Sequence, residues 1–196
     1  MPAASLTSSL APPLTLDQYL AQTWQDDRPH ELIAGVPTLM PPESWRNAQI
    51  STRLLLALAR FVAPAQLSHK DVELAVSGYR AQTRIPDLMV LSPELADLLQ
   101  ARSRAIILPE MPPPLLVVEV VSPGKENADR DYRYKRSEYA ARCILEYWVV
   151  DPQREIVTVL QWVEGLYEEM VRSGDDRLNS AVIPNFDLTV AQILAL

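Results

Sequence analysis

Apolar residues recur at two spacings along the chain, and these spacings predict its helices and strands. Residues three and four apart share one face of a helix, whereas alternate residues share one face of a strand. Helical spacing and capping residues predict helices over residues 15–24, 45–62, 93–104, 127–142 and 189–195. Alternation and short apolar runs predict strands over residues 30–34, 36–40, 71–78, 84–91, 115–121, 146–150, 156–162 and 166–171. Because helices and strands follow each other repeatedly, we expect an α/β (α+β) fold with a central mixed β-sheet flanked by helices.

Capping and turn residues mark several of the boundaries. Thr15 and Gln18 stand in the order of a capping box, which begins a helix. Gly35 separates two strands as a tight turn, and Pro64 ends the long helix because proline lacks an amide hydrogen. Residues 1–14 are rich in Ala, Ser and Pro and predict a disordered leader, so we expect a single domain over residues 15–196.

A carboxylate interrupts the most apolar of the predicted strands. Residues 115–121 read Leu-Leu-Val-Val-Glu-Val-Val, and alternation places Glu119 on one face with Val117 and Val121. Both faces of this strand are apolar, so both are expected to be covered. A buried carboxylate without a partner is strongly unfavourable. Glu119 therefore needs a cation, a basic partner or a raised pKa.

Asp87 is a similar exception on a second strand, where it shares a face with Ile85, Met89 and Leu91. If the two strands are neighbours, the carboxylates repel each other, and a divalent cation relieves both repulsion and desolvation. The alternative is that each acid pairs with a structural arginine. Two histidines and one cysteine cannot form a structural zinc site, so a metal here would be held by oxygen ligands. Oxygen ligands favour Mg²⁺, Mn²⁺ or Ca²⁺.

Lys135 lies on the less polar face of its predicted helix, beside Tyr132 and Tyr139. The helix directly follows the strand that carries Glu119, so the two should pack against each other. Either Lys135 turns toward the sheet, or it reaches solvent or pairs with Asp131 one turn away. Two carboxylates and an ammonium are sufficient for metal-assisted hydrolysis of a phosphodiester, in which the lysine positions water or stabilises the transition state.

Charge argues against extensive contact with nucleic acid. The formal net charge is −7, and acidic chains are repelled by DNA unless basic residues cluster. A basic cluster does occur near the proposed site, at Lys125, Arg130, Arg133, Lys135, Arg136 and Arg142, but acidic residues are interspersed with it. The cluster is either a solvated helix face or a local rim for DNA. No apolar run is long enough to span a membrane.

The cysteine content bears on the compartment. The single cysteine, Cys143, excludes an internal disulfide and is typical of a cytoplasmic protein. We expect Cys143 to be a small buried residue rather than a nucleophile.

Several stretches together resemble the Uma-two family of restriction endonucleases, within the PD-(D/E)xK nuclease superfamily. They occupy residues 117–123, 130–139 and 144–152, with weaker matches at 31–35 and 84–88. The resemblance implies a restriction-endonuclease-like fold. It also implies that Asp87 and Glu119 are metal ligands, joined by the carbonyl oxygen of Val120. The family's catalytic lysine would be Lys135, displaced from the more usual position that Val121 occupies here.

The resemblance implies further site residues. Glu31 would be a catalytic acid from the N-terminal part, although a salt bridge is an equal alternative. Asn47 stands where many relatives have histidine, and it would contact substrate together with Arg130 and Tyr139. Tyr139 could instead have a packing role.

The sequence leaves three functions open. The first is a Mg²⁺- or Mn²⁺-dependent endonuclease that acts on DNA, for which a homodimer is expected because two active sites cut two strands. The second is a non-catalytic binding or scaffold protein with the same fold. The third is a hydrolase of another phosphate ester.

Overall fold

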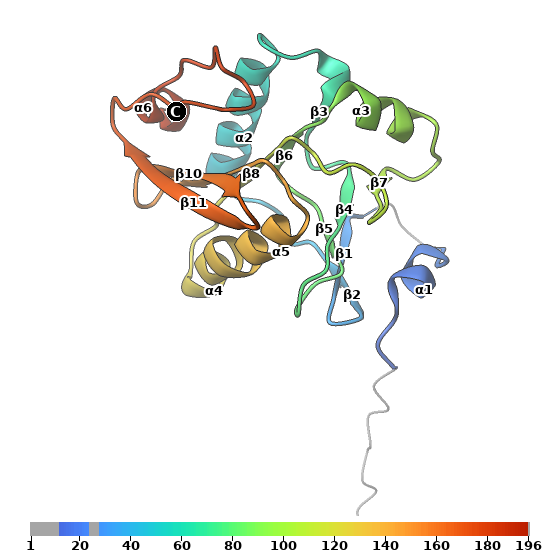
Figure 1. Ribbon diagram of the computed structural model, residues 1–196. Coiled ribbons are helices and arrows are strands. Elements are labelled where there is room, and N and C mark those ends of the chain that lie inside the picture. The colour runs from blue at the N-terminus through green and yellow to red at the C-terminus, as the bar shows by residue number, and fades with distance from the viewer. Residues whose placement is uncertain (1–11, 24–27, 196) are drawn as a thin grey trace, which may run out of the picture.

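The computed structural model describes residues 12–23 and 28–195, and a central six-stranded sheet organises them (Figure 1). The strand order is β11-β10-β9-β8-β6-β3. The bounds are Leu67–Ser68 for β3, Leu88–Val90 for β6, Leu116–Val120 for β8, Glu146–Asp151 for β9, Ile156–Val163 for β10 and Leu166–Ser173 for β11. Strands β8 and β9 are parallel and the other pairs are antiparallel, so the predicted mixed sheet is confirmed.

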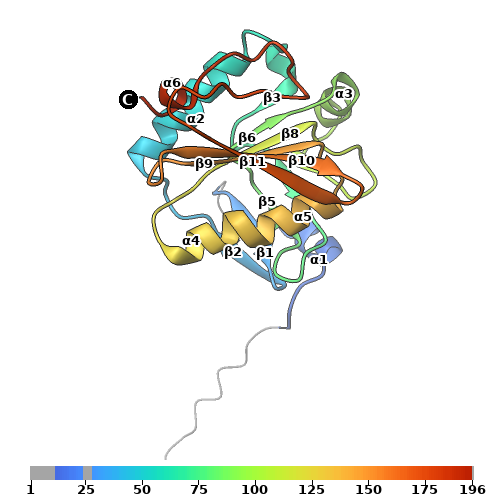
Figure 2. The same ribbon diagram turned by 60° about the vertical axis from the view of Figure 1, so that its left-hand side comes forward.

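Helices cover both faces of this sheet (Figure 2). Helices α2 (Trp45–Leu58) and α6 (Val190–Leu194) lie on one face. On the other face lies a continuous helical rod made of α4 (Lys125–Asp129), η2 (Arg130–Lys135) and α5 (Arg136–Ala141). This rod connects the parallel strands β8 and β9, as parallel pairing requires a crossover. The predicted layers of helix, sheet and helix are therefore present.

Smaller elements lie beside the sheet. Helix α1 (Leu16–Leu20) begins with the predicted capping box, and α3 (Pro93–Gln100) and the 3₁₀ turn η1 (Pro64–Gln66) connect strands. A hairpin consists of β1 (His30–Ile33) and β2 (Val36–Leu39). A three-stranded sheet has the order β5 (Thr83–Arg84), β4 (Glu73–Ala75), β7 (Ile106–Ile107).

The tip of the hairpin requires glycine for two reasons. Gly35 has a φ of +74°, which a residue with a side chain rarely adopts. A Cβ atom on Gly35 would also lie 2.4 Å from the Cβ atom of Pro13. The amide of Leu14 donates to the carbonyl oxygen of Gly35 at 2.8 Å, so the chain before α1 packs on this turn. Most of the predicted leader, residues 1–11, lies outside the described residues.

Alternation along β8 divides the core between the two faces. Leu116, Val118 and Val120 pack with α2 in one apolar cluster. Val117 and Val121 pack with Tyr139 of α5 in the other. The predicted alternation is confirmed, and it directs Glu119 toward the helical rod.

Several local predictions are wrong in detail. The predicted strand over residues 84–91 is two short strands, because the chain leaves the ladder around Pro86, which cannot donate a hydrogen bond. Helix α1 ends at Leu20, and its expected end at Trp24 lies outside the described residues. Cys143 is exposed rather than buried, because it follows the end of α5 with a φ of +56°. Among the described residues, none of the helices has the length and apolar character needed to cross a membrane.

Candidate active site

Asp87 and Glu119 meet where β6 ends beside β8, and Glu119 lies on the sheet face that carries the helical rod. Strands β6 and β8 pair with Leu88 opposite Val118, and this register continued by one residue places Asp87 opposite Glu119. The Oδ2 atom of Asp87 accepts a hydrogen bond from the amide of Val120 at 2.7 Å. The Asp87 side chain thus binds the edge of β8 where β6 has ended. The two acids are brought together as the sequence predicts.

Lys135 reaches Glu119 from the helical rod. Its Nζ atom lies 2.7 Å from the Oε2 atom of Glu119 and 3.3 Å from the Oδ1 atom of Asp131. The hydroxyl of Tyr139 donates to the Oε1 atom of Glu119 at 2.6 Å. The Lys135 side chain is only 3% exposed, so it faces the sheet and does not extend into solvent. Two of the arrangements that the sequence predicts for Lys135 occur together: it faces the sheet, and it pairs with Asp131.

A π-helical segment positions Lys135. Residues Arg130–Lys135 form η2, which is wider than an α-helix and shifts the side chains that follow it around the axis. The hydroxyl of Tyr147, on β9, donates to the carbonyl oxygen of Asp131 at 3.0 Å within this segment. Because Tyr147 is fully buried, this bond ties η2 to the sheet beneath it. Such segments frequently mark functional sites.

Burial and like charges shift the pKa values of the acids upward. Burial raises the pKa of Glu119 to about 7, and the charges of Asp87 and Asp131 contribute, although Lys135 opposes them. Burial likewise raises the pKa of Asp87. Burial acts to lower the pKa of Lys135, but the carboxylates of Glu119 and Asp131 outweigh it and the pKa is raised. Lys135 is therefore an ammonium at neutral pH and is unsuited to act as a base.

Carboxylates outnumber cations in the network around these residues. The acids are Glu31, Glu43, Asp87, Glu119, Asp131 and Glu138, and the cations are Lys70, Arg84, Arg130 and Lys135. The Oδ2 atom of Asp131 is buried and has no hydrogen-bond partner among the described residues. This surplus of negative charge would be offset by protonation or by an added cation.

Glu31 lies in a buried ion-pair network beside the site. Its Oε2 atom is 2.9 Å from the Nη1 atom of Arg84, and its Oε1 atom accepts from the amide of Ile85 at 3.0 Å. Arg84 also binds Glu138 through two nitrogens, at 2.7 and 2.9 Å. Gly78 gives this network room, since a Cβ atom there would lie 2.5 Å from the Cγ atom of Glu138. This geometry favours the salt-bridge alternative for Glu31.

Asn47 holds the end of β8 against the start of α2. Its Nδ2 atom lies 3.2 Å from the carbonyl oxygen of Val121 and 3.4 Å from that of Val120. Asn47 is buried, so its amide serves the strand end and does not face solvent. The carbonyl of Val120 has a second lone pair, which leaves it one position for another partner.

Comparison with known proteins identifies the family of the chain and a solved structure of similar fold. The family model Uma2, described as "Putative restriction endonuclease", matches residues 16–191. The chain belongs to the Uma2 family. A solved structure described as "a putative nuclease belonging to DUF820 from Anabaena variabilis ATCC 29413" is similar in fold, with a TM-score of 0.70 and 15% sequence identity. The match covers 93% of this chain and 98% of that one. No curated protein matches the chain.

Membership of Uma2 confirms the expected family, and the similar solved structure confirms the expected fold class. Together they support a nuclease. The site residues carried over from the resemblance, among them Val120, Asn47 and Tyr139, stay predictions for this Uma2 chain.

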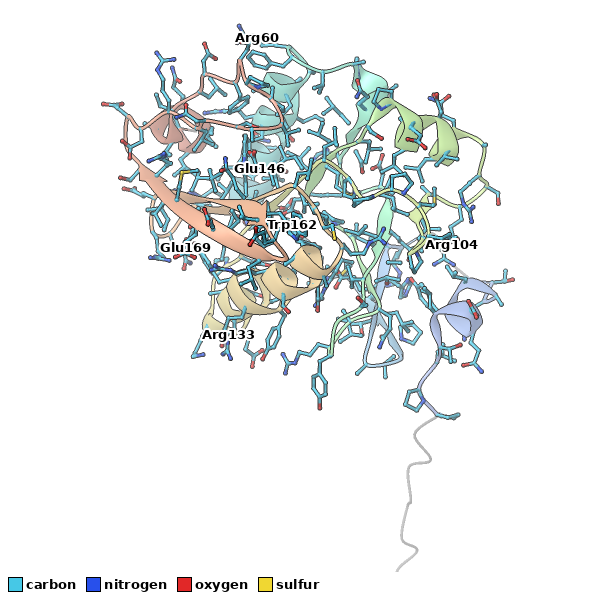
Figure 3. The ribbon with its side chains drawn as sticks, viewed as in Figure 1. Arg60, Arg104, Arg133, Glu146, Trp162 and Glu169 are labelled. Carbon is cyan, nitrogen blue, oxygen red and sulfur yellow. The ribbon has the colours of Figure 1, made fainter. Side chains whose placement is uncertain are left out.

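The basic cluster of this Uma2 protein is largely engaged in internal contacts. Arg130 lies 3.1 Å from Asp131, and Arg133 lies 3.7 Å from Asp129, which also binds Lys125. Arg136 pairs with Glu169, and Arg142 donates to carbonyl oxygens of residues 108–111. Figure 3 shows Arg133 on the outer side of the rod, away from the sheet. This pattern favours a solvated helix face, and Arg130 as a substrate contact stays a prediction.

The donor set fits a hard divalent cation. Two carboxylates and a main-chain carbonyl are oxygen ligands, and Mg²⁺ is commonly held by one or two protein carboxylates, with water and substrate phosphate completing its shell. Among the described residues, no three His, Cys, Asp or Glu side chains converge on one point. A metal at this Uma2 site would therefore be held mainly by Asp87 and Glu119, with the Val120 carbonyl as a third ligand.

Lys70 and Arg84 were not predicted from the sequence to lie at the site. The Nζ atom of Lys70 lies 3.7 Å from the Oδ1 atom of Asp87, and Lys70 comes from a turn that carries no motif. Arg84 had a signal that could have been used, because a basic residue beside the apolar run Ile85–Pro86 needs buried acids as partners.

Proposed function

We propose that this Uma2 protein is an endonuclease that hydrolyses phosphodiester bonds of DNA with Mg²⁺ or Mn²⁺. One observation carries the proposal: Asp87 accepts a hydrogen bond from the Val120 amide at 2.7 Å, beside Glu119, and the Lys135 ammonium lies 2.7 Å from Glu119. Burial raises the pKa of both acids, and perturbed acids that gather at one place are typical of functional sites.

Each residue has a distinct role in this proposal. Asp87 and Glu119 hold the metal together with the Val120 carbonyl, and a bound metal would supply an activated water and offset charge on phosphate oxygens. Lys135, held as an ammonium against Glu119, stabilises negative charge that develops on the phosphate through its electric field and without direct contact. Tyr139 orients Glu119 through its 2.6 Å hydrogen bond. In the net reaction water adds across one P–O ester bond, which leaves a phosphate monoester and a hydroxyl.

Two other functions remain as outcomes of the test. A non-catalytic nuclease-fold protein is favoured by the engagement of both Glu119 oxygens with Lys135 and Tyr139. A hydrolase of another phosphate ester would use the same carboxylates on a smaller substrate. A homodimer, expected for cleavage of both strands, is testable by light scattering.

Incubation of supercoiled plasmid with the protein and Mg²⁺ or Mn²⁺ tests the proposal. We expect nicked and linear products from the wild type. Asp87→Asn and Lys135→Met should each lower the cleavage rate at least about a hundredfold, since the first removes a metal ligand and the second removes a cation that stabilises the transition state. The matched controls are Asp97→Asn and Lys125→Met, because both residues are exposed. They should cleave at the wild-type rate.

Three results would redirect the proposal. If wild type and all variants leave plasmid intact with both metals, the protein is not an endonuclease under these conditions and the non-catalytic alternative gains support. Cleavage of small phosphodiesters alone would favour the third function. Equal cleavage by Asp87→Asn and wild type would show that a different site, or a contaminant, is responsible.

A further inference from the structure

Lys70 is a second lysine at the site, and it contacts Asp87 whereas Lys135 contacts Glu119. Its Nζ atom lies 3.7 Å from the Oδ1 atom of Asp87 and 3.1 Å from the Oγ atom of Ser51, and it also contacts the carboxylate of Glu43. The Lys70 side chain is 27% exposed, whereas the Lys135 side chain is 3% exposed. The ammonium that an incoming ligand can reach at Asp87 is therefore that of Lys70.

The backbone at Lys70 is held in an unusual conformation. Lys70 has a φ of +60°, which a residue with a side chain rarely adopts outside constrained turns. The carboxylate of Asp71 fixes the turn, since its Oδ1 atom accepts from the Ser68 hydroxyl at 2.6 Å and from the His69 amide at 3.0 Å. Conformations of this kind persist where the surroundings over-determine them, and they cluster at functional sites.

Helix α2 supports the same side chain. Ser51 is fully buried on α2, and its hydroxyl lies within hydrogen-bond distance of both Lys70 and the Nε2 atom of His69, at 3.1 and 3.2 Å. The turn and the helix thus aim the Lys70 stem at Asp87. The Lys70 ammonium also pairs with Glu43, whose side chain is 23% exposed. A partly exposed ion pair of this kind is weak and exchangeable.

Lys70 also lines a cavity beside the site. The cavity has a volume of about 690 Å³, within the range of small-molecule sites, and Tyr19, Asp71, Ile85 and Arg104 contribute to its walls. Lys70 joins the cavity to the site, because it lines the cavity and its Nζ atom lies 3.7 Å from the Oδ1 atom of Asp87. Figure 3 shows Arg104 above α1, on this side of the molecule. The cavity offers a nucleotide of the bound strand room beside Lys70.

The other cations near the site are committed elsewhere. Arg84 is buried between Glu31 and Glu138, and Lys135 is buried between Glu119 and Asp131. Arg130 is paired with the buried carboxylate of Asp131. Arg104 is paired with Glu73 and stacked over the ring of Tyr19. Displacing any of these would leave a buried or half-buried carboxylate without its partner, which is strongly unfavourable. The Lys70–Glu43 pair is about as exposed as the Arg104–Glu73 pair, and Lys70 is distinguished by its contact with Asp87.

We propose that Lys70 contacts a non-bridging oxygen of the substrate's phosphate next to Asp87. This inference rests on the proposed nuclease function and assigns the phosphate-contacting cation of that same site. On binding, the ammonium exchanges the carboxylate of Glu43 for the phosphate, while Lys135 keeps its buried contact with Glu119. Before substrate arrives, Lys70 offsets part of the charge of Asp87.

Cleavage kinetics on a short DNA duplex test this role with Lys70→Met, Lys70→Arg and the matched control Lys125→Met. We expect Lys70→Met to lower kcat/KM about tenfold, mostly through KM, because one charge-assisted contact is lost. Lys70→Arg should stay within about threefold of wild type, since arginine keeps the charge and also binds phosphate. Lys125→Met should match wild type.

Two further measurements separate phosphate contact from a structural role. In a Lys135→Met background that holds DNA without cutting it, Lys70→Met should reduce the salt slope of duplex binding by about one. Mn²⁺ binding, followed by electron paramagnetic resonance, should be equal or tighter in Lys70→Met, because a competing cation is removed from Asp87. Loss of Mn²⁺ binding together with activity would overturn the inference and indicate that Lys70 only positions Asp87.

The remaining outcomes distinguish this inference from the proposed function. If the wild type cleaves DNA and Lys70→Met cleaves it equally well, the role of Lys70 is refuted while the nuclease function stands. If the wild type neither binds nor cleaves DNA, the nuclease function fails and the inference falls with it.

Discussion

At the scale of single residues, the site is defined by charges that the fold buries. Glu119, Asp131 and Lys135 are each less than 5% exposed, and Glu31, Arg84 and Glu138 form a second buried group beside them. Buried charges are tolerated when they are paired and hydrogen-bonded, so each cation here is required by the acids around it. Substitutions that are followed by both the free energy of unfolding and the cleavage rate can therefore separate residues that stabilise the fold from residues that act in function.

Arg84→Met should destabilise the protein by about 3–5 kcal/mol, because it leaves Glu31 and Glu138 buried without a cation. The free energy of unfolding in urea measures this loss. Arg133→Met is the control, since Arg133 is exposed, and it should change stability by less than about 0.5 kcal/mol. Adding Glu31→Gln and Glu138→Gln to Arg84→Met should restore part of the loss. A loss below about 1 kcal/mol for Arg84→Met would contradict the network's structural role.

Glu119 should make the metal-free protein less stable as pH rises. Its pKa is about 7 in the folded protein and close to its ordinary value of 4.5 when unfolded. The folded state therefore holds the proton more tightly, and the stability that this gives is lost as pH rises from about 4.5 to 7. The full change is of the order of 3 kcal/mol.

Glu119→Gln supplies the reference for this measurement, because glutamine does not titrate. Unfolding in EDTA is compared between the two proteins from pH 5 to pH 8. The wild type should lose stability relative to Glu119→Gln as pH rises across this range. A difference that stays constant with pH would mean that Glu119 titrates at its ordinary pKa in the folded protein.

At the scale of elements, the π-helical segment η2 links the sheet to the site. Tyr147→Phe removes the hydroxyl that donates to the Asp131 carbonyl and should lower stability by about 1–2 kcal/mol. It should also slow plasmid cleavage several-fold, because η2 carries Lys135. Tyr167→Phe is a matched control, since its buried hydroxyl donates to the Ile144 carbonyl at 2.8 Å, away from η2. Similar cleavage by both variants would argue against a positioning role for η2.

The elements that could be predicted from sequence are those with a strong local signal. The hairpin around Gly35 and strand β8 appear where the sequence places them. Helix α2 begins at Trp45 as predicted but ends at Leu58, before Val62 and Pro64. The short strands β3 and β7 were missed because two residues carry no period. The π-helical character of η2 depends on a contact with Tyr147 from another strand, so spacing along the rod alone cannot reveal it.

Residues of the candidate site could likewise be predicted only where they have a strong local signal in the sequence. Asp87, Glu119 and Lys135 were identified because each is a charge within an apolar pattern. Lys70 lies in a turn, where a lysine is unremarkable, and its contact with Asp87 is a product of the tertiary fold. Pairing between Glu31 and Arg84 likewise joins elements far apart in the chain.

At the scale of the whole molecule, the sheet determines where the carboxylates meet and which side covers them. One face is covered by α2 and α6 and the other by the helical rod (Figure 2). The Asp87 side chain is 18% exposed. An acidic molecule of net charge −7 is unsuited to long electrostatic contact with DNA. We therefore expect DNA to contact only a small area of the surface beside Asp87, where Lys70 and a metal would supply the positive charge.

A crystal soaked in Mn²⁺ tests the central claim most directly. The account predicts an anomalous density peak with Asp87 and Glu119 among the ligands of the ion, and with the Val120 carbonyl beside them. Crystals of Asp87→Asn treated in the same way should lack the peak. A wild-type crystal in which Asp87 and Glu119 keep their contacts with Lys70 and Lys135, and no ion lies between them, would contradict the account.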